Sequence, residues 1–120
     1  MTNENHFSIS KTVKAPLPRV PFSKIKESVL DNDYELSLVF IGDKLSRKLN
    51  RIYRGKDKPT NILSFPITKN SGEIFINLSR AKPFGPAYLF IHGLLHLKGM
   101  QHGRRMERTE EKFLKEFQVQ

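Results

Sequence analysis

The sequence predicts an α/β fold, a single domain in which a mixed sheet of roughly four strands is flanked by helices. Short runs rich in β-formers alternate along the chain with segments whose apolar residues recur at helical spacing. The length of 120 residues fits one hydrophobic core, and no repeat or long linker divides it. The expected order of elements over residues 1–120 is β-α-β-α-β-β-α-α.

The first half of the chain predicts two strands and an intervening helix. Apolar residues alternate with polar ones from Phe7 to Val13, which favours a strand, and three prolines then mark a connector. Pro21 opens a short amphipathic helix that runs to Leu30 and ends at an Asp-Asn-Asp turn. The run from Tyr34 to Ile41 is dense in β-formers and is expected to be a central strand.

A second helix is expected after Gly42, with Asp43 as its capping residue. Its basic residues point away from one apolar face, which is expected to contain Leu45, Leu49, Ile52 and Tyr53. The helix therefore predicts a basic surface.

The second half predicts a hairpin followed by two helices. Asn61 to Pro66 and Glu73 to Leu78 are short β-like runs, and the turn-forming Lys69 to Gly72 lies between them. Pro86 suits the first turn of a helix that passes through Leu97 and ends at Gly99. From Arg104 onward, apolar residues at helical spacing predict a last helix with a charged outer face.

Composition narrows the classes of partner and site. The formal net charge of +9 favours binding to a polyanion, with nucleic acid the leading choice. The absence of cysteine excludes disulfides and thiolate metal sites, and fits a cytoplasmic protein. The chain contains neither a secretory leader pattern nor a run of apolar residues long enough for a membrane span, so we expect no membrane association.

Three of the four histidines lie within the segment HGLLHLKGMQH. Because residues four apart lie on the same helix face, His92 and His96 can bind one ion. Gly99 then allows the chain to leave the helix, so that His102 can supply a third nitrogen. Three imidazoles leave a tetrahedral zinc ion one open position for water. We expect one zinc ion per chain, although nickel or another borderline ion would suit the same ligands.

A metal held in this way favours hydrolysis, because it lowers the pKa of bound water and polarises a carbonyl or phosphoryl oxygen. The spacing with Gly99 matches the extended zinc motif of metzincin proteases. In those enzymes the residue after the first histidine is a general-base glutamate, and here it is Gly93. Proteolysis by that mechanism would therefore lack its proton acceptor.

The histidine segment resembles the YbeY family of metal-dependent bacterial endoribonucleases, whose motif His-Gly-x-Leu-His-Leu-x-Gly-x-x-His is met from His92 to His102. A second block, Leu49 to Pro66, is similar to the family too, as is the GEIFIN run that follows it. The resemblance implies an α/β fold with a mixed four-stranded sheet and three histidines as zinc ligands. It also implies action on ribosomal RNA, in maturation of the small-subunit 3′ end, with the ribosomal small subunit as partner.

The resemblance further places Arg54 in the same cleft, where its guanidinium can bind phosphate through two hydrogen bonds. Arg54 and His92 are thus the expected catalytic residues. An edge strand from Thr60 to Pro66 is expected to flank the cleft, with Ser64 able to donate to substrate. The expected contacts to the RNA backbone come from basic residues of the second helix and the loop after it: Lys48, Arg51, Lys56 and Lys58.

Departures from the family pattern leave two alternatives open. Gln101 and Asn61 stand where the family usually has aspartate, and the connection from Ser79 to Tyr88 is short. A lost carboxylate near a metal removes a possible orienting group or base. The chain could therefore be an RNA-binding assembly factor for the ribosome with a structural metal. The other alternative is a metal-dependent hydrolase of another substrate.

Overall fold

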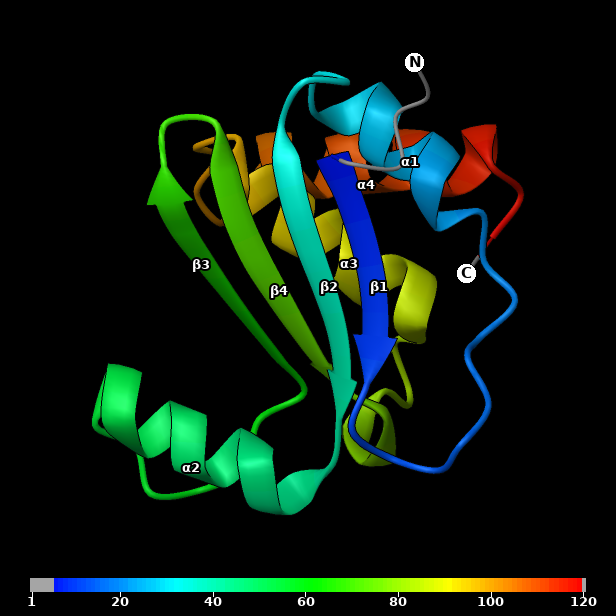
Figure 1. Cartoon of the computed structure of the whole chain (residues 1–120). Coiled ribbons are helices and arrows are strands. Elements are labelled where there is room, and N and C mark those ends of the chain that lie inside the picture. The colour runs from blue at the N-terminus through cyan, green and yellow to red at the C-terminus, as the bar shows by residue number, and fades with distance from the viewer. Residues whose placement is uncertain (1–5, 120) are drawn as a thin grey trace.

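A mixed four-stranded sheet forms the centre of the molecule (Figure 1). The computed structural model describes residues 6–119. Its strands are β1 (Phe7–Lys11), β2 (Glu35–Ile41), β3 (Ile62–Thr68) and β4 (Ser71–Asn77), in the order β1-β2-β4-β3. β2 is parallel to both β1 and β4, whereas β3 pairs antiparallel with β4. The expected mixed sheet, the interior position of β2 and the edge position of β3 are confirmed.

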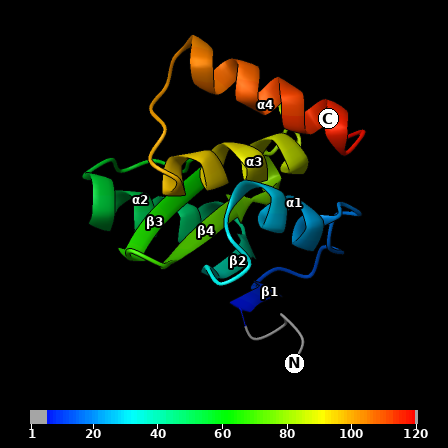
Figure 2. The same cartoon turned by 90° about the horizontal axis from the view of Figure 1, so that it is seen from above.

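The helices are α1 (Phe22–Val29), α2 (Asp43–Arg54), α3 (Pro86–Leu97) and α4 (Arg104–Glu116), and a short 3-10 turn, η2 (Leu78–Arg80), precedes α3. α1 and α3 cover one face of the sheet, and α4 lies over the outer side of α3 (Figure 2). α2 lies apart from them, at the end of the sheet where β2 finishes. None of the helices in residues 6–119 is both long and apolar enough to cross a membrane.

The core lies between the sheet and α1 and α3. Alternate residues of β2 and β4 point into it, among them Leu38, Phe40 and Ile76, because successive side chains of a strand face opposite sides. From α3, Phe90 packs edge-on against Phe22 of α1, with ring centroids 5.0 Å apart. α3 thus packs against α1 as well as against β3 and β4, which matters because α3 carries two of the three clustered histidines.

The apolar face expected on α2 is wrong in part. Ile52 and Tyr53 are 57% and 64% exposed, whereas the buried residues of the helix are Ser46 and Asn50. Both buried side chains bind the following loop: the Ser46 hydroxyl donates to the carbonyl of Thr60 at 2.7 Å, and the Asn50 amide donates to that of Lys58 at 2.8 Å. The buried side of α2 is therefore held to the following loop by hydrogen bonds to backbone carbonyls, although the spacing of its apolar residues predicted hydrophobic packing.

The sequence predicted Asp43 as the capping residue of α2, and this prediction is wrong. Gly42 occupies the N-cap position, and Asp43 is the first residue of the helix. Its carboxylate accepts hydrogen bonds from Arg80 Nε and Asn77 Nδ2, each at 2.8 Å. The hydrogen bond from Arg80, followed by that from Asn77, lowers the pKa of Asp43. Asp43 thus ties the start of α2 to the segment that leads into α3.

The hairpin is tighter than expected. β4 begins at Ser71 instead of Glu73, so that Lys69 and Asn70 alone form the turn. The hydroxyls of Thr68 and Ser71 lie 2.7 Å apart and link the two strands beside this turn.

Candidate metal centre

His92, His96 and His102 converge at the C-terminal half of α3 and the loop that follows it. One ligand nitrogen from each residue lies within 4.8 Å of the other two. His92 and His96 share a face of α3, because they are one helical turn apart. Gly99 has a φ of 101°, a left-handed conformation that favours glycine, and it ends the helix so that His102 returns toward α3.

Hydrogen bonds to Nδ1 orient two of the rings. Nδ1 of His92 donates to the carboxylate of Glu110 at 2.5 Å, and Nδ1 of His96 donates to the carbonyl of Met100 at 3.1 Å. Both acceptors lack a proton, so the protons of the neutral imidazoles reside on Nδ1 and the Nε2 atoms carry lone pairs. These two Nε2 atoms lie 3.1 Å apart and face one another.

Such an arrangement fits a cation. Two facing lone pairs cannot hydrogen-bond to each other, whereas a divalent ion between them satisfies both. Tetrahedral zinc with Zn–N bonds of about 2.0–2.1 Å separates its nitrogen ligands by roughly 3.4 Å, close to the observed spacing. The three residues therefore suit an ion held by nitrogen ligands.

Glu110 is the site residue that sequence reasoning missed. It belongs to α4 and is only 3% exposed, although the outer face of that helix is charged. Its second carboxylate oxygen accepts a hydrogen bond from the Tyr88 hydroxyl at 3.4 Å. A carboxylate that binds the far nitrogen of a metal-ligating histidine fixes the tautomer and orientation of the ring. The sequence offers no signal for it beyond one glutamate among several on α4.

The environment of His96 favours a neutral imidazole. Burial lowers its pKa below the usual value, and the positive charges that His92 and His102 carry when protonated lower it further. A neutral imidazole is the form that binds metal.

Gly93 packs directly onto the sheet. A Cβ at this position would lie 3.0 Å from Ile62 Cδ1 and 3.1 Å from Ile74 Cδ1. Residue 93 therefore faces β3 and β4 and not the histidine cluster. The close packing disfavours a larger side chain here, so the structure adds a steric reason to the chemical one against a metzincin-type protease.

Comparison with known proteins places the chain in a family. The profile described as Endoribonuclease YbeY matches residues 1–118. The chain belongs to this family. The resemblance of the chain to the YbeY family, which rested on the histidine motif and the block from Leu49 to Pro66, is thereby confirmed.

Individual relatives agree with this assignment. The chain is 36% identical to the Endoribonuclease YbeY of Thermodesulfovibrio yellowstonii, over 66% of this chain and 64% of that protein. It is 27% identical to that of Clostridium botulinum over 97% of this chain and 95% of the relative. The chain thus spans just under two thirds of the first relative. The latter alignment has 157 positions, more than the 120 residues here, so the relative contains residues with no counterpart in this chain.

A solved structure shares the fold. The solution structure of a Thermotoga maritima protein matches 92% of this chain and 88% of its own, with a TM-score of 0.59 and 21% sequence identity. At that identity the match concerns the fold alone.

Arg54, Lys56 and Lys58 come together at a basic hollow of about 780 Å³ behind the C-terminal end of α2. Arg80 and Lys82 line the same hollow from the connection before α3. Within residues 6–119, the side chain of Arg54 has no hydrogen-bond or ion-pair partner, which leaves its guanidinium available to a ligand. The histidines do not line this hollow, and among the described contacts none joins them to Arg54.

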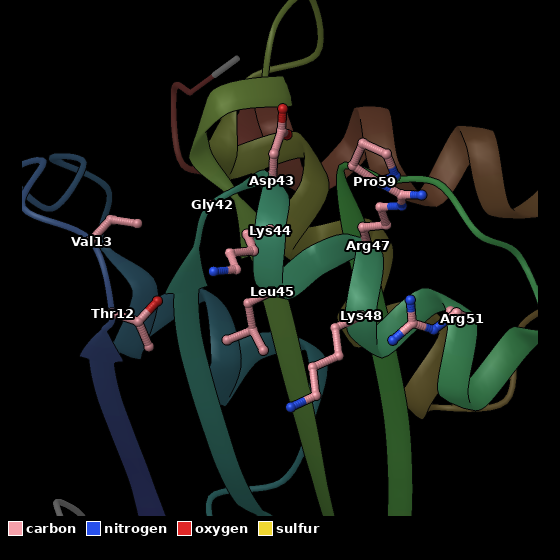
Figure 3. A pocket seen from close by; sticks show the side chains of 10 residues that line it. All are labelled: Thr12, Val13, Gly42, Asp43, Lys44, Leu45, Arg47, Lys48, Arg51 and Pro59. Carbon is pink, nitrogen blue, oxygen red and sulfur yellow. The ribbon is translucent and has the colours of Figure 1, made fainter.

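Lys48 and Arg51 lie elsewhere, on a second hollow of about 1030 Å³ along α2. Figure 3 shows their side chains and that of Lys44 extending from α2 around this hollow. Asp57 offsets part of this charge, because its carboxylate pairs with Arg47 at 2.9 Å and lies 3.7 Å from Arg51. The expected basic surface is therefore divided between two hollows.

The hydroxyl of Ser64 donates to the carbonyl of Gly93 at 3.1 Å. This hydrogen bond joins β3 to α3 next to the metal centre, and it engages the proton that we expected Ser64 to donate to substrate. A role in substrate binding stays a prediction.

Proposed function

We propose that this protein is a zinc-dependent endoribonuclease of the cytoplasm that processes ribosomal RNA, including the 3′ end of the small-subunit RNA. The observation that carries the proposal is the pair of facing Nε2 atoms of His92 and His96 in a member of the YbeY family. His102 completes the ligand set. A tri-histidine site with no protein carboxylate as ligand fits a hydrolytic ion with an open position.

When bound, the ion would supply activated water and polarise a phosphoryl oxygen. His92, His96 and His102 would hold it, and Glu110 would keep the ring of His92 in its ligating orientation. Arg54 would bind a backbone phosphate, because a guanidinium offers parallel hydrogen bonds to two phosphate oxygens. Lys56 and Lys58 would neutralise neighbouring phosphates, with Lys48 and Arg51 extending the track along α2.

The net charge of +9 supports an RNA substrate over a peptide. Gly93 counts against a peptide as well, because the residue that serves as general base in metzincins is absent and close packing against Ile62 and Ile74 disfavours it here. The ribosomal small subunit is the proposed partner, since its RNA presents the substrate.

The sharpest test compares two histidine variants. His96→Ala removes a proposed ligand, and His6→Ala removes the one histidine that lies outside the cluster. Metal analysis should find one ion per chain in the unmodified protein and in His6→Ala, and much less in His96→Ala. An unmodified protein that retains no stoichiometric metal would overturn the site.

The same proteins are then incubated with a 3′-extended small-subunit RNA fragment and, separately, with casein. We expect RNA cleavage by the unmodified protein and by His6→Ala, no cleavage by His96→Ala, and no loss of casein. Equal RNA decay with all three proteins would indicate a contaminating nuclease. Metal and RNA binding without cleavage would favour the assembly-factor alternative, with the ion as a structural element.

A further inference from the structure

Three aromatic rings form a continuous stack that ends at the metal centre. Phe84 and Tyr88 lie 5.2 Å apart between ring centroids, and Tyr88 and His92 lie 5.8 Å apart, each pair with an interplanar angle of 20°. Tyr88 and His92 lie one turn apart on α3, and Phe84 belongs to the turn that precedes this helix. His92 is at its inner end, and Phe84 is at its outer end.

The outer ring is open to solvent. Phe84 is 48% exposed, one of the few large apolar side chains of residues 6–119 with so much exposed surface. Tyr88 is only half-buried, and its hydroxyl is held by Glu110. Glu110 thus holds both inner rings through hydrogen bonds to Tyr88 and His92. Among the described residues, Tyr88 is the one aromatic contact of Phe84, so the other face of the Phe84 ring has no aromatic partner.

The segment that leads to this open ring carries positive charge. Lys82, two residues before Phe84, is exposed and lines the basic hollow together with Arg54. Arg80 lines it as well, although Asp43 engages its guanidinium. An exposed ring followed along the strand by a basic hollow is a combination that binds single-stranded nucleic acid, since the ring stacks on a base while the cations neutralise the backbone.

We infer that Phe84 is a stacking platform for one nucleobase of single-stranded RNA, with Lys82 on the adjacent phosphate. The site deepens the proposed function and rests on it for the identity of its ligand. Phe84 and His92 are separated by two centroid spacings, of 5.2 and 5.8 Å. Neighbouring stacked nucleotides rise by only about 3.4 Å each, so several of them span the distance between the two rings. The bound base therefore belongs to a nucleotide a few positions away from the phosphate at the metal centre, and Phe84 serves to position the strand.

The chain offers a direct test because it contains no tryptophan. Phe84→Trp introduces a single tryptophan at the platform, and Ile67→Trp introduces one at a position of β3 that is somewhat more exposed, 60% against 48%. Short single-stranded oligoribonucleotides are titrated in EDTA, which prevents metal-dependent cleavage. We expect quenching at position 84 by the RNA and much weaker quenching by an oligonucleotide with abasic sites, and little response at position 67 to either.

Affinity gives an independent measure. Phe84→Ala should weaken binding of the RNA about ten-fold, within the range for loss of one base–aromatic stack, and should leave binding of the abasic oligonucleotide unchanged. Phe84→Trp should retain the affinity. Equal affinity of Phe84→Ala and the unmodified protein would overturn the platform, as would an equal loss for both oligonucleotides. Thermal unfolding of each variant establishes that it is folded.

The result is separable from the fate of the proposed function. With metal-loaded protein, Phe84→Ala should raise KM for RNA and leave kcat nearly unchanged, because the ring does not touch the reacting phosphate. If the unmodified protein stacks RNA at position 84 but never cleaves it, the nuclease proposal fails and the platform stands. If cleavage persists and tryptophan at position 84 is not quenched, the platform fails alone.

Discussion

The carboxylate of Glu110 accepts a hydrogen bond from Nδ1 of His92 at 2.5 Å, and this contact joins α4 to the metal centre. Nearly all of the Glu110 side chain is buried, so its charge has few other partners. The contact sets the ring of His92 with Nε2 toward the other ligands. A residue on the last helix thereby controls a ligand on the helix before it.

Replacing Glu110 should weaken metal binding while leaving all three ligands in place. Glu110→Gln keeps the shape but replaces an anionic acceptor by a neutral one, and we expect a loss of about 10- to 100-fold in zinc affinity. Competition with a chromophoric chelator measures it. The matched control is Glu111→Gln, an exposed neighbour on α4, which should bind zinc like the unmodified protein. Unchanged affinity in Glu110→Gln would contradict the orienting role.

The position of Glu110 shows where sequence reasoning reaches its limit here. His92 and His96 could be paired from their spacing, because helix geometry is local. The contact between His92 and Glu110 depends on how α4 crosses α3. The spacing of apolar residues predicts which face of α4 is buried, but it does not predict which residues of α3 lie opposite that face. Glu110 occurs between the buried Met106 and Phe113, so it sits on the packed face.

Gly93→Ala should destabilise the protein, although glycine to alanine inside a helix is ordinarily stabilising by roughly 0.5–1 kcal/mol. The added Cβ would meet Ile62 Cδ1 and Ile74 Cδ1 at 3.0 and 3.1 Å, so these side chains or α3 must move. We expect a net loss of about 1–3 kcal/mol in the free energy of unfolding, measured by denaturant titration.

A compensating change distinguishes this clash from other causes. Ile62→Val removes the Cδ1 atom that the new Cβ would meet. The double variant should therefore be more stable than the sum of the two single losses predicts. Strict additivity would mean that the loss arises elsewhere.

α2 shows the same limit for packing. Its boundaries could be predicted from the spacing of its residues, and so could its basic surface. Its buried residues, Ser46 and Asn50, are fixed by hydrogen bonds to carbonyl groups of the loop from Lys58 to Thr60. The path of that loop cannot be predicted from the spacing of apolar residues. The division of the basic residues between two hollows depends on that same loop, and was not predictable from charge counts.

Without metal, the stability of the protein should fall as the pH is lowered through about 6.5. Folding lowers the pKa of His96 from its usual value of 6.5, mainly through burial. Below that pH the unfolded chain binds more protons than the folded one, so the free energy of unfolding decreases until the pH reaches the lowered pKa. Chemical denaturation of the metal-free protein between pH 5 and 8, as an approximate range in which histidine titrates, measures the slope.

His96→Asn removes this titrating group and should make the slope shallower. His6→Asn removes a histidine outside the cluster and should preserve the slope of the unmodified protein. A slope that is the same with and without His96 would show that other groups govern the pH dependence.

Binding of RNA at the basic hollow should depend on salt through Lys56 and Lys58. Each phosphate contact with a single strand contributes about 0.7 to the slope of log affinity against log salt concentration. The double variant Lys56→Ala/Lys58→Ala should therefore weaken binding at low salt and reduce the slope by about 1.4, with both side chains in contact with phosphate. Fluorescence anisotropy with a single-stranded oligoribonucleotide over a range of salt concentrations gives both quantities.

Lys24→Ala, on the exposed side of α1 at the opposite end of the sheet, is the control for net charge and should change the slope little. Equal slopes for the double variant and the control would mean that the hollow binds no RNA phosphate and that the positive charge acts only at long range.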